Sequence, residues 1–267
     1  MVYGELVILN NDQEGVENGS LLALDRRTGE TAWEVKRHAK RISYSTPCVF
    51  ELPDSGKEAL VFTNWTHGFT AVDPADGRVI DDESVFDQEN NERAISSPFV
   101  FGDMIMGTCG FTKYPKHAVA MRLTEKGGFE EVWRIERSIP HIPCPIFVNG
   151  LMFFWDDAGI VTCLEPADGM VLWRERVEAK GEMYGSPVSD GKRIFCIDKE
   201  GMVSVIAASR NFKLLAQNDL ADVCRSTPAI DGGMMYVRTF RKLIAVKGRE
   251  EGLSSTGFDA GGRVRSK

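Results

Sequence analysis

The chain has 267 residues, of which 43% are hydrophobic and 27% charged, a composition typical of a globular protein and not of a disordered or membrane-embedded one. Its formal net charge of −7 has the wrong sign for phosphate-driven binding to nucleic acid or to an anionic lipid surface. No apolar run approaches the ~20 residues of a membrane span, and residues 1–5 lack the pattern of a signal peptide, so neither is predicted.

Self-similar segments recur about every 40 to 50 residues. Each begins with a short motif, mostly Ser or Thr followed by Pro, at Pro47, Pro98, Pro145, Pro187 and Pro228. A first β-rich run follows at residues 60–63, 104–106, 151–154, 194–197 and 235–237. A second run comes directly afterwards at residues 70–73, 119–121, 161–164, 203–206 and 243–246. Turn residues between the two runs, such as Gly68, Gly159 and Gly201, indicate tight hairpins.

A sharp turn that opens with Asp or Glu and closes with Gly follows the second run at residues 25–29, 73–77 and 165–169. Four residues beyond the glycine stand Trp33 and Trp173, with Asp81 in the second copy, whereas a diverged copy has Gly128 and Trp133 instead. Each unit thus contains four short strands, A to D. Residues 211–223 are the nearest candidate for a helix, but their place in the repeat predicts strand D.

A four-stranded antiparallel unit with this period predicts an all-β protein, a β-propeller of about six blades. Residues 23–33 read A-x-D-x-x-T-G-x-x-x-W, which resembles the repeat of the PQQ-like, quinoprotein-type β-propeller family. Residues 165–173 match with one conservative change, and residues 226–243 are similar to the last repeats of bacterial members. The resemblance covers about residues 4–247 and implies one propeller domain over residues 1–249, leaving residues 250–267 as a disordered tail.

The family contains two functional classes. Its quinoprotein dehydrogenases bind pyrroloquinoline quinone and calcium over the channel and typically carry two adjacent cysteines, whereas BamB-type members of the barrel-assembly machinery bind partners without a cofactor. The six cysteines of this chain include no adjacent pair and no C-x-x-C motif, and no calcium set can be placed on matching positions. We therefore predict no catalytic residues, no metal and no cofactor. Cys163 and Cys196 lie in apolar runs and are expected to be buried.

The tryptophans Trp33, Trp133 and Trp173 resemble the docking residues that pack one blade of the family on the next.

The strand positions also indicate whether the first and last units are complete. The first unit starts with a B strand at residues 4–9 and no A strand before it, and no clear D strand follows residues 243–246. We therefore hypothesise an N-terminally shortened form of a longer propeller, since propellers normally close with strands from both termini. The alternative is a six-repeat ring with a weak seam.

Strand order predicts that the D-to-A and B-to-C connections share a top face, with strand A innermost. Candidate binding residues before the repeat prolines are Arg41, Tyr44, Arg93, His141, Tyr184 and Arg225. The B-to-C turns add Trp65, His67, Trp155, Arg238 and Phe240, a composition typical of a protein-binding surface. The arginines Arg41, Arg93 and Arg225 either form a basic funnel at the channel mouth or pair with neighbours such as Glu92, Glu182 and Asp222. Acids such as Asp156 and Asp157 are expected to cap their turn.

These features predict a non-catalytic module that binds a protein partner through its top face. One alternative is a quinone-dependent dehydrogenase, or a fragment of one, that uses pyrroloquinoline quinone and calcium. Another is a site for a small anion or glycan at the channel mouth. No nucleic acid partner is expected. The resemblance implies a periplasmic or surface location if the N-terminus is truncated, and a cytoplasmic one if Met1 is the true start.

Overall fold

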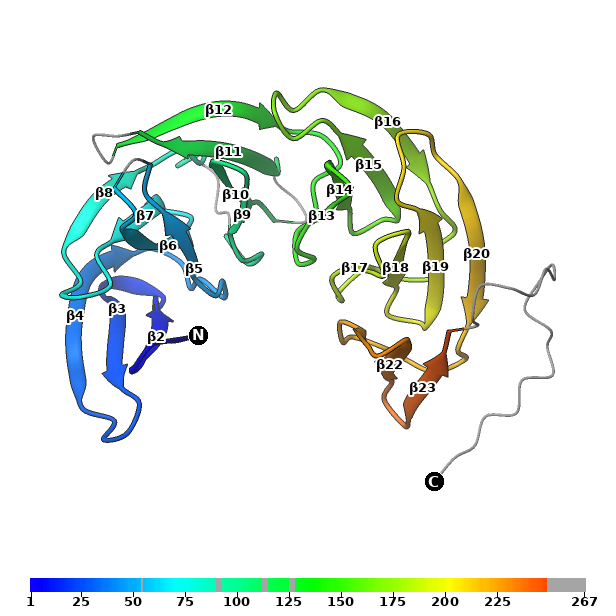
Figure 1. Cartoon of the computed structure of the whole chain (residues 1–267), viewed down its shortest axis with the longest axis horizontal. Helices are drawn as coiled ribbons and strands as arrows, with labels where there is room; N and C mark the ends of the chain where they lie inside the picture. Colours follow the sequence, from blue (N-terminus) through cyan, green and yellow to red (C-terminus); the bar gives the residue numbers. More distant parts are fainter. Residues whose placement is uncertain (54, 90–92, 112–114, 125–127, 249–267) are drawn as a thin grey trace.

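The computed structural model describes residues 1–53, 55–89, 93–111, 115–124 and 128–248, which form 23 strands and no helix. The strands make six antiparallel sheets that follow one another along an arc (Figure 1). Within the described ranges, no segment has the helical structure needed to cross a membrane as a helix. The prediction of an all-β propeller with about six blades is confirmed.

Sheets 1 to 6 are named in chain order, and their strands pair in sequence order. Sheet 1 contains β1 (Val2–Tyr3), β2 (Leu6–Asn11), β3 (Gly15–Asp25) and β4 (Thr31–Ala39). Sheet 2 contains β5 (Cys48–Glu51), β6 (Glu58–Asn64), β7 (Gly68–Val72) and β8 (Val79–Glu83). Sheet 3 contains β9 (Phe99–Phe101), β10 (Met104–Cys109), β11 (His117–Leu123) and β12 (Phe129–Ile135).

Sheet 4 contains β13 (Ile146–Val148), β14 (Leu151–Trp155), β15 (Ile160–Leu164) and β16 (Val171–Arg176). Sheet 5 contains β17 (Val188–Ser189), β18 (Arg193–Ile197), β19 (Met202–Ala207) and β20 (Leu214–Asp219). Sheet 6 contains, among the described residues, β21 (Ala229–Asp231), β22 (Met234–Arg238) and β23 (Leu243–Lys247). The first strand of each sheet lies on the inner side of the arc, and the fourth strands β4, β8, β12, β16 and β20 follow its outer side (Figure 1).

Each repeat proline marks the start of a first strand, because β5, β9, β13, β17 and β21 begin at the next residue. The residue before the proline joins neighbouring sheets. The backbone N–H of Thr46 donates to Ser97 Oγ at 2.9 Å, and that of Cys144 donates to Ser186 Oγ at 2.9 Å. The N–H of Ser186 in turn donates to Thr227 Oγ1 at 3.0 Å. These bonds explain why a hydroxyl precedes most of the prolines.

The structure corrects the expectation for the start of the chain. Sheet 1 does have a first strand, because β1 pairs with β2 through Val2↔Val7 and Tyr3↔Leu6. Sheets 1 and 6 stand at opposite ends of the arc in Figure 1, so a six-sheet ring with a weak seam is not what the described residues form. The predicted tail at residues 250–267 lies outside the described residues, and the truncation hypothesis remains a prediction.

The second and third strands are apolar runs because neighbouring sheets cover both of their faces. Every residue of β7, β10 and β14 is buried. Each pair of successive sheets encloses its own hydrophobic cluster, such as the one in which Val61 and Phe69 of sheet 2 contact Ile105 and Val119 of sheet 3. Burial on both faces favours short continuous hydrophobic segments over strict alternation, and this made the runs recognisable in the sequence.

A β-bulge recurs in the fourth strand of sheets 1 to 5 and sets the direction of one side chain. At this position Trp33 of sheet 1 packs on Gly77 of sheet 2 and donates its Nε1–H to the carbonyl oxygen of Pro74 at 2.9 Å. Trp133 of sheet 3 does the same on sheet 4, with Pro166 O at 2.7 Å. Both tryptophans therefore fix one sheet against the C-to-D turn of the next.

The same position is filled differently in the other sheets. Trp173 donates to Ser209 O of sheet 5 at 3.4 Å. Asp81 of sheet 2 has no aromatic ring, and its carboxylate instead accepts a hydrogen bond from Phe129 N of sheet 3 at 2.6 Å. In sheet 5 the position is Ala216, opposite Val205. An alanine cannot reach across to sheet 6, so that junction lacks the tryptophan or carboxylate contact of the others.

Gly68 closes the hairpin of sheet 2 with φ +68°, and a Cβ there would overlap the carbonyl oxygen of Glu83. We expect Gly68→Ala to reduce the free energy of unfolding by at least about 2 kcal/mol, because it adds this overlap to the strain of a left-handed backbone. Gly102→Ala is the control, since Gly102 has φ +58° with nothing within 4 Å. It should cost only about 1 kcal/mol in urea unfolding. Equal losses would contradict the overlap.

Candidate interaction surface

The connections between sheets and the hairpin turns between second and third strands lie on one face, named here the loop face. A single hollow is lined both by Arg225, from the connection to sheet 6, and by Phe240, from the hairpin turn of sheet 6. The A-to-B and C-to-D turns meet elsewhere, since Arg26 of one turn pairs with Glu5 of the other at 2.7 Å. The sequence-based assignment of turns to faces therefore agrees with these contacts.

The three arginines expected at a channel mouth are each engaged locally. Arg41 forms an ion pair with Glu14. The guanidinium of Arg93 lies 5.5 Å over the ring of Phe111, and that of Arg225 lies 5.4 Å over the ring of Tyr184. The ion pair of Arg41 fits the pairing alternative, whereas the aromatic contacts of Arg93 and Arg225 belong to neither alternative. Glu92 lies outside the described residues.

The tyrosines differ in their surroundings. Tyr44 projects from the connection between sheets 1 and 2 and is 57% exposed. Tyr184 is half-buried beneath Arg225, and its hydroxyl donates to Glu182 at 3.0 Å. The hydroxyl bond lowers the pKa of the Glu182 carboxyl, with further contributions from Lys199 and Arg225. Tyr44 is thus available for contacts, whereas Tyr184 supports an arginine.

His141 lies among Phe111 and Asp157 at the loops of sheets 3 and 4. Its ring meets that of Phe111 edge-on at 5.2 Å between centroids, and its backbone N–H donates to Asp157 Oδ1 at 2.9 Å. The Nε2 atom is buried without a hydrogen-bond partner among the described residues. Burial lowers the pKa of the imidazole below its ordinary value of 6.5, although Asp157 acts in the opposite direction.

The lowered pKa predicts that the imidazole of His141 makes the free energy of unfolding decrease in acid. The unfolded chain binds the imidazole proton at higher pH than the folded chain does, so stability falls as pH drops below 6.5 towards the lower folded pKa. We expect the urea midpoint to fall between about pH 7.5 and 5.5, and to fall less in His141→Asn. Chemical unfolding at both pH values checks this. An identical pH dependence in the variant would contradict it.

Two of the predicted contact residues lie in the core. Trp155 is fully buried at the end of β14, and Trp65 is 6% exposed and donates its Nε1–H to Asp87 O at 2.7 Å. Neither indole can meet a partner, so their assignment to a binding surface is wrong. His67 is held as well, with Nδ1 2.7 Å from Asp82 Oδ2 and Nε2 2.9 Å from His38 O.

The first residue of several hairpin turns is an acid or amide that organises the turn. Asp156 accepts hydrogen bonds from the backbone N–H groups of Ala158 and Ile160 at 2.9 and 2.8 Å. Asn64 and Asp198 make equivalent bonds in their own turns. The expectation that Asp156 caps its turn therefore agrees with the structure. Asp157, by contrast, pairs with Lys116 of the neighbouring turn.

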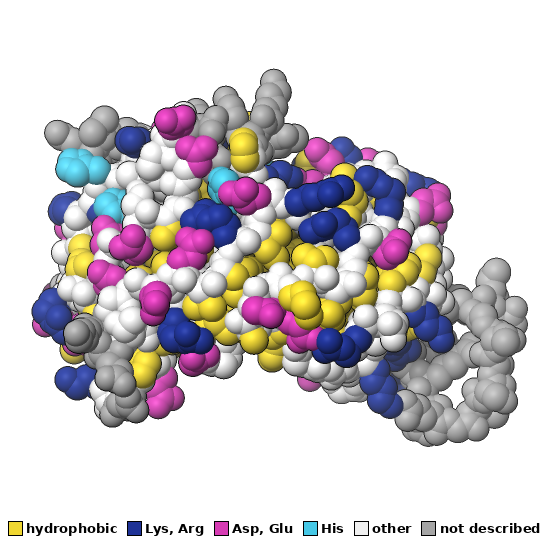
Figure 2. Space-filling model, turned by 90° about the horizontal axis from the view of Figure 1, so that it is seen from above, with side chains coloured by type: hydrophobic (Ala, Val, Ile, Leu, Met, Phe, Trp, Pro, Cys, Tyr) yellow, Lys and Arg dark blue, Asp and Glu magenta, His cyan; other side chains and the backbone are white. Residues whose placement is uncertain are grey.

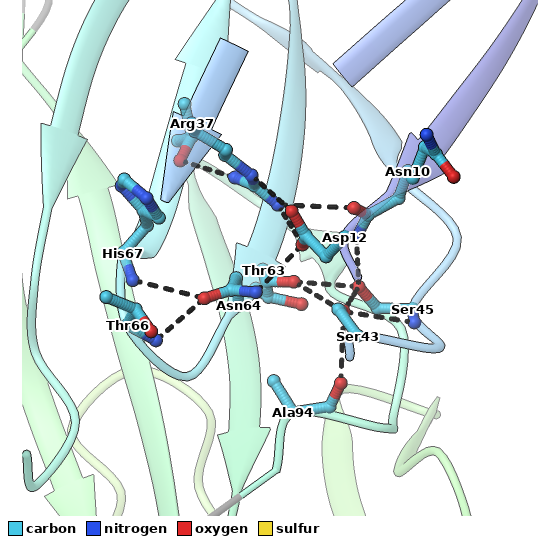
Figure 3. Close-up of polar contacts among 12 residues, drawn as sticks. Asn10, Asp12, Arg37, Ser43, Ser45, Thr63, Asn64, Thr66, His67 and Ala94 are labelled. Atoms are coloured by element: carbon cyan, nitrogen blue, oxygen red, sulfur yellow. Dashed lines mark hydrogen bonds and ion pairs between the residues drawn. The ribbon is translucent and has the colours of Figure 1, made fainter. Parts of the chain in front are cut away.

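A buried polar network between sheets 1 and 2 was not anticipated from the sequence (Figure 3). Arg37 of β4 is paired with Asp12, and its side chain is 4% exposed while that of Asp12 is fully covered. The guanidinium also donates to Thr70 Oγ1 at 3.1 Å and Asn10 Oδ1 at 3.2 Å. Asn64 Nδ2 donates to Asp12 Oδ2 at 2.8 Å. The network fixes the hairpin turn of sheet 1 against sheet 2.

The cysteines lie apart from one another and form no disulfide among the described residues. Cys163 and Cys196 are fully buried, as expected. Burial raises the pKa of Cys163 to about 12 and that of Cys48 to about 12, so both remain thiols at neutral pH. Within the described ranges, no three His, Cys, Asp or Glu side chains are placed to hold a metal ion together. The cofactor prediction remains a prediction.

The outer side of the arc is seen from above in Figure 2. A band of hydrophobic side chains crosses the middle of this view, Lys and Arg side chains gather at the upper right, and no basic stripe runs across the whole face. Surfaces that bind nucleic acid through phosphates generally present such a basic stripe. The expectation that nucleic acid is not a partner remains a prediction.

The successive antiparallel sheets, the docking side chains at the bulges of sheets 1 to 4 and the shared loop face define a β-propeller protein. The chain matches the family described as "Outer membrane protein assembly factor BamB" over residues 1–106 and 116–248, and it belongs to that family. This confirms the resemblance found in the repeat motifs.

Individual relatives are distant. The outer membrane protein assembly factors BamB of Escherichia coli K12 and of Shigella dysenteriae are each 25% identical over 93 residues, which is 35% of this chain and 23% of theirs. The match therefore spans less than a quarter of those curated relatives.

Solved structures resemble the fold. A quinohemoprotein alcohol dehydrogenase from Comamonas testosteroni has a TM-score of 0.61 at 12% identity, over 91% of this chain and 54% of that one. BamB from Moraxella catarrhalis gives a TM-score of 0.47 at 12% identity, over 91% of this chain and 86% of that one. At this identity the likeness to the dehydrogenase concerns the fold alone.

Proposed function

We propose that this chain is a non-catalytic binding module that holds a protein partner on its loop face, in an assembly role at the bacterial outer membrane. Membership of the BamB family supports an interaction role and a periplasmic or outer-membrane-associated location. The contact residues would be Tyr44, Arg225, Arg238 and the exposed Phe240, while Trp65 and Trp155 are excluded because they are buried.

The observation that carries the proposal is the set of aromatic and arginine side chains exposed on the loop face. Phe240 is 85% exposed at a hairpin turn, and Arg225 and Arg238 line the hollow beside it. Tyrosine and arginine are enriched among residues that dominate protein–protein binding energy.

The proposal is tested by purifying a tagged chain from its native cells and comparing co-purified proteins by quantitative mass spectrometry. Tyr44→Asp places a charge on the loop face, and Ala167→Asp places one on an exposed C-to-D turn as a matched control. We expect the first variant, and not the second, to lose a partner that wild type retains. Equal retention by both would contradict a loop-face contact.

The same proposal holds that the module works without a quinone cofactor. Titration with pyrroloquinoline quinone and calcium, followed by a dye-reduction assay over alcohols and aldose sugars, checks this directly. We expect neither saturable binding nor turnover. Saturable binding with turnover would replace the proposed function by the dehydrogenase alternative.

A further inference from the structure

A hollow of about 510 Å³ lies at the loop face of sheet 6, beside the connection from sheet 5, and is named here the corner pocket. Two segments line it, Val223, Arg225 and Ser226 before β21, and Arg238, Thr239 and Phe240 at the end of β22. Its volume is within the range that pockets for drug-sized ligands or a few peptide side chains occupy.

The walls of the corner pocket are fixed to one another by hydrogen bonds. The backbone N–H of Phe240 donates to Val223 O at 2.7 Å, and Ser226 Oγ donates to Arg238 O at 2.7 Å. Thr239 Oγ1 donates to the buried carboxylate of Asp222 at 2.8 Å. The backbone of the pocket is therefore formed before any ligand arrives, which reduces the entropy cost of binding.

The charge of the corner pocket is opposite to that of the whole protein. Its lining contains two arginines and no acid. The guanidinium of Arg225 lies over Tyr184, and no ion pair of Arg238 is found among the described residues. The nearby carboxylate of Asp222 is already bonded to Arg241 Nε at 3.0 Å. Glu182, whose pKa is lowered in part by Arg225, pairs with Lys199 at 3.2 Å.

A second hollow on the loop face, at the turns around sheets 4 and 5, differs from the corner pocket because its cationic side chains are already in ion pairs. It is lined by three lysines, but each is already paired. Lys116 pairs with Asp157, Lys180 with Asp219 at 2.6 Å, and Lys199 with Glu182. A ligand there would have to displace an existing ion pair. Of these two hollows, only the corner pocket offers cationic side chains without a carboxylate in its lining.

Apolar side chains lie beside the two arginines. Phe240 is 85% exposed and Val223 is 40% exposed, and Leu243 on the next strand is 74% exposed. A small inorganic anion would satisfy the guanidiniums but leave these hydrophobic surfaces in water. A peptide segment that carries a carboxylate next to an apolar side chain would satisfy both.

We propose that the corner pocket binds an acidic peptide segment of the protein partner, with an Asp or Glu carboxylate between Arg225 and Arg238 and an adjacent apolar side chain against Phe240 and Val223. This inference rests on the proposed function and names the chemistry of the partner. It makes sheet 6, which lacks a docking tryptophan from sheet 5, the part of the arc that the partner covers.

The test uses a displayed library of random short peptides, selected on the full chain. The selected sequences should be enriched in an acidic residue next to an apolar one. Synthetic peptides of those sequences should bind R225E and R238E about tenfold more weakly than wild type, and F240S several-fold more weakly. K180E is the matched control because it changes the charge equally in the other hollow, and it should bind like wild type.

Three results would overturn the corner-pocket proposal. Peptides without acidic enrichment, or equal binding to wild type and R238E, would overturn the proposal. So would full competition by free glutamate or inorganic phosphate at the concentration of the peptide, which would indicate a small-anion site. Thermal unfolding of each variant identifies any loss of fold. If Tyr44→Asp loses the cellular partner while the library shows no acidic selection, the binding function stands and the corner pocket assignment fails.

Discussion

Replacing Arg37 by methionine is expected to lower the free energy of unfolding by about 3–5 kcal/mol. The substitution keeps much of the apolar stem but removes the cation that Asp12 faces inside the network of Figure 3. The carboxylate of Asp12 is fully covered, so among the described residues it would retain only the hydrogen bond from Asn64 Nδ2 at 2.8 Å. A buried charge that loses its partner is far more costly than the net contribution of the intact pair.

Urea unfolding monitored by tryptophan fluorescence measures this loss. Arg122→Met is the matched control, because Arg122 pairs with Asp103 at 2.7 Å with the two side chains 42% and 61% exposed. Exposed pairs contribute about 0–1 kcal/mol, so the control should change little. A comparable loss in both variants would mean that the network of Arg37 contributes no more than a surface ion pair.

Trp133→Ala is expected to cost about 3–5 kcal/mol. The indole of Trp133 is buried between sheets 3 and 4, packs on Gly169 and donates to Pro166 O at 2.7 Å. Truncation leaves a cavity at a junction that is otherwise covered, and it also removes the only side-chain hydrogen bond that Pro166 O receives among the described contacts.

Phe240→Ala serves as the comparison for Trp133→Ala in thermal and urea unfolding. Phe240 is 85% exposed, so its truncation should change stability by less than about 0.5 kcal/mol. The pair of variants separates the two roles given to aromatic residues, packing between sheets and contact with a partner. If Trp133→Ala unfolds at the wild-type midpoint, the docking role of the bulge position is incorrect.

Much of the fold was predictable because its repeating features are local. Pro187 and its equivalents sit directly before a first strand, and a proline that starts a strand leaves no unpaired N–H inside a sheet. The apolar runs of the middle strands stand out because both of their faces are covered. The two-residue strand β1 was missed since a strand of that length carries no periodic signal.

The site was less predictable because it depends on contacts between distant residues. Arg37 and Asp12 are separated along the chain and are polar, so no hydrophobic pattern links them. Trp65 directly follows β6 and Trp155 ends β14, at positions that looked exposed, but both side chains are buried in the hydrophobic clusters between sheets. The polar residues that organise the hairpin turns did carry a recognisable sequence signal. Asn64, Asp156 and Asp198 occupy equivalent places at the end of the second strand or directly after it, and short polar residues at a repeated turn position commonly bond the turn backbone.

Photo-crosslinking from defined positions tests most directly whether the loop face binds a protein partner. A photoreactive residue is placed at Tyr44 or Phe240 on the loop face, and at Ala75 or Ala167 on the exposed C-to-D turns as controls. In native cells, we expect a discrete adduct of higher mass from the loop-face positions and none from the control positions. Adducts only from the control positions, or the same adducts from both faces, would contradict it.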